Sequence, residues 1–198
     1  MKPEATWHFD GDLKSALVAA ARNIVESDGA ATLTLRGVAR ATGVSAMAPY
    51  HHFKDRAALV AAVAAAGFAQ LYTEKIAALA DAPGDPAQRI VAGSIAYVRF
   101  VTQHPELYRL MKSAELADRA AHPALAAAAA RPGATLHAML AELAAAGRLH
   151  GTTPAAAGQI LWAMVHGIGT LAIDAYVADA EVLAADGAAA LLAGWGAL

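Results

Sequence analysis

The sequence predicts an all-α protein of about nine helices. Hydrophobic residues make up 58% of its 198 residues and charged residues 16%, and alanine is especially abundant. Alanine is the strongest helix former, and few β-branched runs compete with it. Apolar residues also recur at three- and four-residue spacing along most of the chain, which is typical of helices with one buried face. A chain of this length can form one or two compact domains with a sizeable core.

Capping residues, glycines and prolines divide this pattern into separate helices. Asp10-Gly11-Asp12 is expected to cap the first helix and Gly29 to end it. Residues 81–86 are the clearest linker, and Arg131-Pro132-Gly133 is expected to interrupt an alanine-rich segment that opens at His122-Pro123. The expected helices cover residues 13–28, 35–41, 46–53, 56–80, 87–103, 106–117, 134–146, 154–177 and 181–195.

Two short helices around a glycine form the most informative stretch of the chain. Leu35, Val38 and Ala39 share one face of the first. Gly43 can adopt the left-handed conformation of a helix-ending turn, and Ser45 is a favourable N-cap for the second helix. Small residues at 39 and 43 would let the two helices cross closely. This arrangement predicts a helix-turn-helix.

The charge of this stretch favours a nucleic-acid partner. From residue 36 to residue 56, four basic residues face one acidic residue, and two histidines lie among them. A basic face on a helix-turn-helix is typical of a surface that binds duplex DNA. Two short helices around a glycine also occur in all-α proteins that never touch DNA. The alternative is therefore a helical small-molecule binding protein or enzyme whose helix-turn-helix is only structural.

The segments TLTLRGVA, ATGVS, PYHHF and KDRAAL resemble the N-terminal domain of the tetracycline-repressor (TetR-like) family of bacterial transcription regulators. Trp162 with His166-Gly167 resembles the WHG-type effector domain of a subset of that family. The resemblance implies a helix-turn-helix DNA-binding domain at residues 10–71 and an effector-binding and dimerisation domain at residues 72–198. It further implies a homodimer that binds a double-stranded operator, with repression released by a small-molecule effector of unknown identity.

The resemblance also assigns roles within the helix-turn-helix. Tyr50 matches a DNA-contacting tyrosine of the family and Lys54 a phosphate contact, while Arg36 is placed to pair with a guanine edge. The sequence departs from the family pattern at Met47, where glycine is frequent, and at Pro49, where leucine is frequent. Base specificity is therefore in doubt. The expected DNA-contacting residues are Arg36, Ser45, Ala46, Met47, Tyr50, His51, His52, Lys54 and Arg56.

An effector pocket is expected among the helices of the second domain. His166 lies four residues after Trp162 and so on the same helix face. Each apolar or aromatic candidate could equally be a packed core residue, since apolar residues at helical spacing mostly pack together. The candidate pocket residues are Tyr72, Tyr97, Phe100, Met111, Met139, Trp162 and His166.

The helix that begins at Pro154 is apolar around most of its circumference and about as long as a membrane-spanning helix. Gln159, His166 and three glycines within it, with no basic cluster on either flank, argue against a membrane. A helix apolar nearly all round must be buried on more than one side, so we expect a second subunit to cover it. The expected interface residues are Leu161, Val165, Ile168, Ile173 and Leu191.

Several classes of site are not expected. The chain has no cysteine, which excludes disulfides, thiolate zinc sites and cysteine nucleophiles. It contains no HExxH, no glycine-rich phosphate loop and no GxSxG, so we expect no enzyme activity, no metal site and no cofactor. The segment MKPEATWHFDGD lacks an apolar core of signal-peptide length, from which we expect a cytoplasmic protein without a membrane partner.

Overall fold

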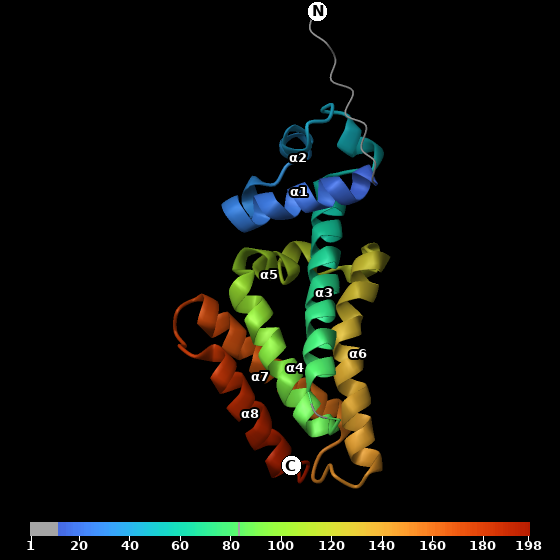
Figure 1. Ribbon diagram of the computed structural model, residues 1–198. Coiled ribbons are helices and arrows are strands. Elements are labelled where there is room, and N and C mark those ends of the chain that lie inside the picture. The colour runs from blue at the N-terminus through green and yellow to red at the C-terminus, as the bar shows by residue number, and fades with distance from the viewer. Residues whose placement is uncertain (1–11, 83) are drawn as a thin grey trace, which may run out of the picture. The chain divides into compact units, whose positions relative to one another are not determined.

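The computed structural model describes residues 12–82 and 84–198 (Figure 1). Within these residues the chain forms eight α-helices, four short 3-10 helices and no strand, which confirms the all-α prediction. Residues 10 and 11, part of the expected first cap, lie outside the described residues. The elements are α1 (Leu13–Asp28), η1 (Ala30–Thr32), α2 (Leu35–Thr42), η2 (Ala48–His51), α3 (Arg56–Asp81), α4 (Pro86–Gln103), α5 (Pro105–Met111), η3 (Ala114–Leu116), η4 (Arg119–Ala121), α6 (Pro123–Ala145), α7 (Pro154–Ile173) and α8 (Ala180–Gly194).

The chain folds into two compact units. Unit 1 comprises the described residues up to Gly67 together with Glu106–Ala126, and unit 2 comprises Phe68–Pro105 together with Ala127–Leu198. Helices α3 and α6 therefore each contribute residues to both units.

Unit 1 is organised by the packing of α2 against α1. The Asp12 carboxylate caps α1 by accepting a hydrogen bond from the Lys14 N–H at 3.0 Å, and the Thr34 hydroxyl caps α2 by accepting from the Gly37 N–H at 3.0 Å. Leu17, Ala21 and Val25 form the buried face of α1. Leu35, Val38 and Ala39 form the buried face of α2, as predicted.

Unit 2 is built around α4, which packs against α7 and α8, while α7 and α8 pack against each other (Figure 1). The helices approach closely at Gly169 of α7, where an added Cβ would lie 2.9 Å from Cγ1 of Val101 on α4. Leucine, isoleucine and methionine side chains from α3, α4, α6, α7 and α8 meet in one core. Its large members are Leu79, Ile90, Met139, Leu140, Leu143, Leu161 and Leu192.

Two predicted helix boundaries were wrong at C-terminal ends. The helix expected over residues 106–117 ends at Met111, and the chain continues through the 3-10 helices η3 and η4. The helix expected to reach residue 177 ends at Ile173. There Ala175 adopts φ 61°, and the Tyr176 N–H donates to the Leu171 carbonyl at 2.9 Å. This is a Schellman ending with alanine in the position that glycine usually occupies, so the sequence carries no signal for it.

The expected interruption at Arg131-Pro132-Gly133 was also wrong. Helix α6 continues through Pro132 to Ala145. A proline inside a helix removes one backbone hydrogen bond and crowds the preceding turn, but packing can hold such a helix together. Pro132 is buried, and Met139 and Leu140 anchor the residues that follow in the core of unit 2.

By length and composition alone, two described helices, α3 and α7, are apolar enough to cross a membrane. The core helices of soluble proteins pass the same test, and both of these helices contribute side chains to the unit 2 core. The finding therefore gives little support to a membrane-spanning role.

Candidate DNA-binding surface and regulatory unit

The turn of the helix-turn-helix depends on the backbone conformation of Gly43. This residue ends α2 with φ 71° and ψ 20°, in the left-handed region, as predicted. A Cβ added there would meet no atom within 4 Å. The expectation that Gly43 allows a close helix crossing was therefore wrong. Glycine is favoured at position 43 because the turn requires a left-handed backbone conformation.

The second element of the motif is a 3-10 helix, η2, and not the longer α-helix expected over residues 46–53. Pro49 lies in its first turn and has no N–H to donate. The Tyr50 N–H donates to the Met47 carbonyl and the His52 N–H to the Pro49 carbonyl, both at 3.0 Å and both across three residues. Met47 occupies the N-cap position without a side-chain cap, so Ser45 does not cap η2 as expected; its backbone carbonyl accepts from Ala48 instead.

Most of the expected DNA contacts lie on the surface of unit 1. Pro49 and Phe53 are buried and hold the segment against the unit, while Tyr50 is 43% exposed and the Lys54 side chain 80% exposed. Arg40, which was not among the expected contacts, is exposed as well and lies one turn after Arg36 on α2. The exposed residues of the expected set are Arg36, Ser45, Ala46, Met47, Tyr50, His51, His52 and Lys54.

Arg56 differs from the others because its guanidinium is bound within unit 1. Its Nε donates to the Leu33 carbonyl at 3.0 Å, its Nη2 to the Ala30 carbonyl at 2.8 Å, and its Nη1 pairs with Glu115 at 2.6 Å. Leu33 and Ala30 belong to the connection between α1 and α2, so Arg56 ties this connection to α3. The geometry favours a structural role over the expected phosphate contact.

The expected pocket residues do not gather at one site. Tyr97, Phe100 and Met139 are buried in unit 2, whereas Met111 belongs to unit 1, where its Sδ would lie 2.7 Å from a Cβ on Gly67. Trp162 is 49% exposed and stacks on His166 with the ring centroids 5.2 Å apart. The ring of Tyr72 carries the guanidinium of Arg131 at 3.9 Å, and that of Phe100 lies 5.0 Å from His104.

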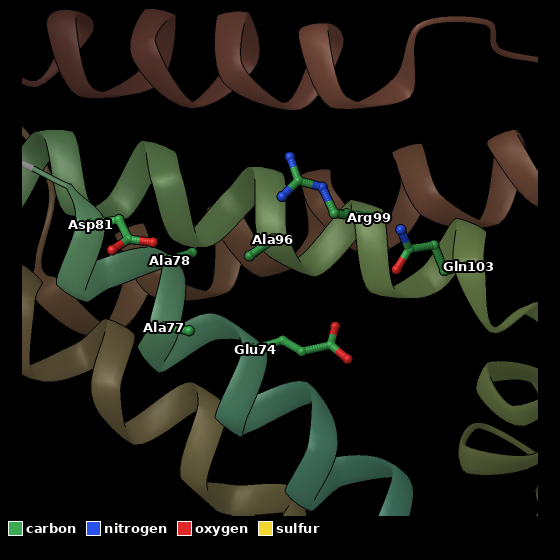
Figure 2. A pocket seen from close by; sticks show the side chains of 7 residues that line it. All are labelled: Glu74, Ala77, Ala78, Asp81, Ala96, Arg99 and Gln103. Carbon is green, nitrogen blue, oxygen red and sulfur yellow. The ribbon is translucent and has the colours of Figure 1, made fainter.

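A pocket of about 300 Å³ lies between α3 and α4 in unit 2, and Figure 2 shows its lining side chains. None of the seven expected pocket residues contributes to it. Arg99, one of the lining residues, donates hydrogen bonds to both carboxylate oxygens of Glu181 on α8 at 2.6–3.1 Å. These hydrogen bonds raise the pKa of Arg99 above its usual value. The lining residues are Glu74, Ala77, Ala78, Asp81, Ala96, Arg99 and Gln103.

Sequence reasoning missed one functional candidate in unit 2, Lys75. It occupies a core position of α3, between Leu71 and Leu79 at four-residue spacing, and only 8% of it is exposed. Burial lowers the pKa of its amine from 10.5 to about 8. The sequence signal that could have identified Lys75 is a lysine at a position where the helical spacing of α3 predicts an apolar residue. Among residues 12–82 and 84–198, no three histidine, aspartate or glutamate side chains lie where they could hold a metal ion.

The expected interface residues are mostly turned inward. Leu161, Val165 and Ile168 are at most 8% exposed within a single chain, which leaves little of their surface for a partner. This face of α7 is packed against α4 and α8, so the structure favours the exposed residues of α7 and α8 over these three for an interface. Ile173 and Leu191 remain partly exposed. The large apolar side chains that α7, α8 and their connection do expose are Ile160, Trp162, Leu171, Tyr176, Val182 and Leu183.

Comparison with known families matches both parts of the chain. The model described as "Bacterial regulatory proteins, tetR family" matches residues 17–63, which include the helix-turn-helix. The model described as "Tetracyclin repressor-like, C-terminal domain" matches residues 90–193, more than half of the chain. The chain belongs to the TetR family. It is a DNA-binding transcription regulator with a C-terminal regulatory domain.

Solved structures share the whole TetR fold. A protein of unknown function from Rhodococcus sp. RHA1 is 31% identical, with a TM-score of 0.86 over 98% of this chain and 100% of that one. The TetR-family regulator PfmR from Thermus thermophilus is 18% identical, with a TM-score of 0.69 over 89% and 97%. FadR from Bacillus subtilis, solved in complex with stearoyl-CoA, is 14% identical, with a TM-score of 0.72 over 90% and 96%. No curated protein matched.

Proposed function

We propose that this TetR-family protein is a cytoplasmic repressor that binds a double-stranded operator as a homodimer and releases it when a small molecule binds. DNA binding is assigned to residues 10–71 and regulation to residues 72–198. The observation that carries the proposal is the group of exposed side chains at Tyr50, His51, His52 and Lys54, in the element that follows the turn at Gly43. The matching families and structures give no support to a merely structural helix-turn-helix.

Specific binding by so short an element requires two copies. Two-fold dimers of helix-turn-helix proteins read half-sites about 34–36 Å apart, one turn of DNA. The exposed side chains on α7 and α8 supply the proposed interface: Trp162 is 49% and Val182 60% exposed. Large apolar side chains gathered on two adjacent helices are typical of a surface that a partner covers.

Release by a small molecule follows from a difference in affinity. An effector that binds one dimer conformation more tightly shifts the population toward it, and DNA affinity falls by the same coupling free energy. FadR from Bacillus subtilis, which shares this fold, was solved in complex with stearoyl-CoA, and acyl compounds are therefore one class of ligand to test.

The proposal is tested by selecting bound sequences from a random duplex pool and measuring the affinity of the selected duplex against salt concentration. We expect a palindromic site and a sedimenting dimer at micromolar concentration. Val182→Glu and Trp162→Glu, one at a time, should each give a folded monomer with weak operator affinity. Ile76→Glu, which alters an exposed apolar residue on α3, is the matched control and should remain dimeric. A wild-type monomer, or equal affinity for all duplexes, would contradict the proposal.

A further inference from the structure

Lys75 is enclosed by three helices of unit 2. Leu71, Lys75 and Leu79 follow one another on the buried face of α3. The Cε of Lys75 would lie 3.5 Å from a Cβ on Gly93 of α4, so the absence of a side chain at Gly93 gives the lysine its space. Its Nζ donates to the backbone carbonyl of Pro132 in α6 at 3.3 Å. Figure 1 shows the later half of α3 between α4 and α6.

The contacts of Lys75 leave its ammonium largely unsatisfied. A lysine ammonium has three N–H donors, and the bond to Pro132 is the one that the described residues supply. Burying a charge without a counter-charge is strongly unfavourable. A methionine would fill the same volume without that cost. Stability therefore does not account for a lysine at this position.

The helices around Lys75 offer no counter-charge. On α3, the neighbouring Glu74 accepts a hydrogen bond from a glutamine side chain and lines the pocket of Figure 2. On α4, the titratable group one turn beyond Gly93 is Tyr97. On α6, Arg131 is itself cationic, with its guanidinium over a tyrosine ring. Burial is accordingly what lowers the pKa of the Lys75 amine to about 8.

The segment of α6 beside the ammonium, at Pro132 and Gly133, is less stable as a helix than the rest of α6. Pro132 has no N–H, so the carbonyl of Ala128 lacks the donor that an unbroken helix would give it. The next residue, Gly133, has open space around its Cα and favours the helix less than other residues do. Helix α6 is thus weakest next to the Lys75 amine, where a ligand group needs room.

We propose that Lys75 binds the carboxylate of an apolar small molecule, and that this compound is the effector. The inference rests on the proposed function of a ligand-released repressor and names the ligand class of its regulatory unit. A single carboxylate supplies the missing counter-charge and accepts from the two remaining N–H donors. The rest of the ligand is apolar, because Lys75 lies between the buried Leu71 and Leu79 on α3, and Leu79 belongs to the core cluster of unit 2.

Protonation links this binding to pH. The carboxylate favours the charged amine, so the pKa of Lys75 rises when the ligand binds. Above pH 8 the free protein holds a neutral amine and must take up a proton on binding. Carboxylate affinity is therefore full below about pH 8 and falls roughly tenfold for each pH unit above it, until the pKa of the complex is reached.

The test is calorimetric titration of the intact protein with the sodium salts of straight-chain acids from hexanoate to dodecanoate, each paired with the alcohol of equal chain length. At least one acid should bind, with about 30-fold lower affinity at pH 9.5 than at pH 7 and with proton uptake seen as buffer-dependent heat. Its alcohol should bind without pH dependence. Lys75→Met should lose acid binding and unfold at a higher temperature, and Lys75→Arg should bind acids without pH dependence, because arginine stays charged.

Lys112, a partly buried lysine of unit 1, provides the control, and Lys112→Met should keep the wild-type response. The inference is overturned if no acid binds, or if Lys75→Met binds acids as the wild type does. Operator binding by the ligand-free protein is measured in parallel. If the protein binds its operator but no acid binds to it, the inference about Lys75 is wrong and the proposed function stands. If the protein binds no operator, the proposed function is wrong.

Discussion

Replacing Arg56 with glutamine should lower the stability of the protein without changing how its DNA binding depends on salt. The guanidinium donates to the carbonyls of Ala30 and Leu33 and pairs with Glu115. Truncation leaves both carbonyls without this donor. A phosphate contact at Lys54 would behave in the opposite way, since its side chain is 80% exposed and its nearest carboxylate oxygen, on Asp55, is 3.9 Å from its Nζ.

The expected loss can be worked out from the three interactions. Each hydrogen bond from a charged donor to a partly buried carbonyl contributes about 1–1.5 kcal/mol net. The ion pair with Glu115 adds at most about 1 kcal/mol, because both side chains are 37% exposed and water screens the pair. Arg56→Gln should therefore lower the free energy of unfolding by roughly 2–4 kcal/mol, equivalent to about 5–15 °C in Tm. Glu115→Gln, which spares both carbonyl bonds, should lose less than about 1 kcal/mol.

Urea unfolding followed by circular dichroism measures the first quantity, and fluorescence anisotropy against salt measures the second. Lys54→Gln should leave the unfolding midpoint unchanged and reduce the salt slope by about 0.9 for each lysine that contacts a phosphate, hence about 1.8 for a dimer. The reasoning is refuted by an Arg56→Gln protein of wild-type stability whose salt slope falls as that of Lys54→Gln does.

Three further predictions concern the regulatory unit. Gly169→Ala should cost about 1–3 kcal/mol in urea unfolding, because its Cβ would clash with α4, whereas Gly167→Ala, with open space around it, should be neutral or slightly stabilising. Ala175→Gly should raise stability by roughly 1 kcal/mol in the same assay, because φ 61° is unfavourable for alanine; an unchanged midpoint would show that the backbone is relaxed there. Hydrogen bonds from Arg148 hold the pKa of Asp85 in the folded protein below its usual 3.8. The stability that this ionised carboxylate contributes is therefore present above pH 3.8 and is lost as the pH falls toward the lower folded pKa. Asp85→Asn should flatten the fall in Tm across that acid range, and an equally steep fall would contradict the linkage.

Elements with local causes could be predicted from the sequence. The boundary at Gly29 and the turn at Gly43 follow from backbone conformations that glycine adopts easily, with φ 81° and 71°. The cap at Asp12 follows from a side chain that accepts a hydrogen bond from the next helical turn. The helix-turn-helix was recognisable for the same reason, since its turn residues and its buried face are set within a short segment.

The remaining features depend on contacts between distant segments. Pro132 predicts a helix break locally, yet packing of the flanking residues in α6 keeps the helix continuous. The second element of the motif is a 3-10 helix and not the expected α-helix, a difference that helical spacing of apolar residues cannot reveal. The role of Arg56 likewise required Glu115, which is 59 residues away in the sequence.

The interface residues show why composition alone could not decide which face of α7 meets a partner. An apolar residue at nearly every position indicates that the helix is buried on several sides, but it removes the periodicity that would identify each side. The fold supplies the missing information, because Gly169 brings α7 against α4 and thereby turns Leu161, Val165 and Ile168 inward. An arginine at Ile168 would thus unfold the single chain and say nothing about association. A charge at an exposed position such as Trp162 or Val182 leaves that core intact, so changes of this kind can separate dimerisation from folding.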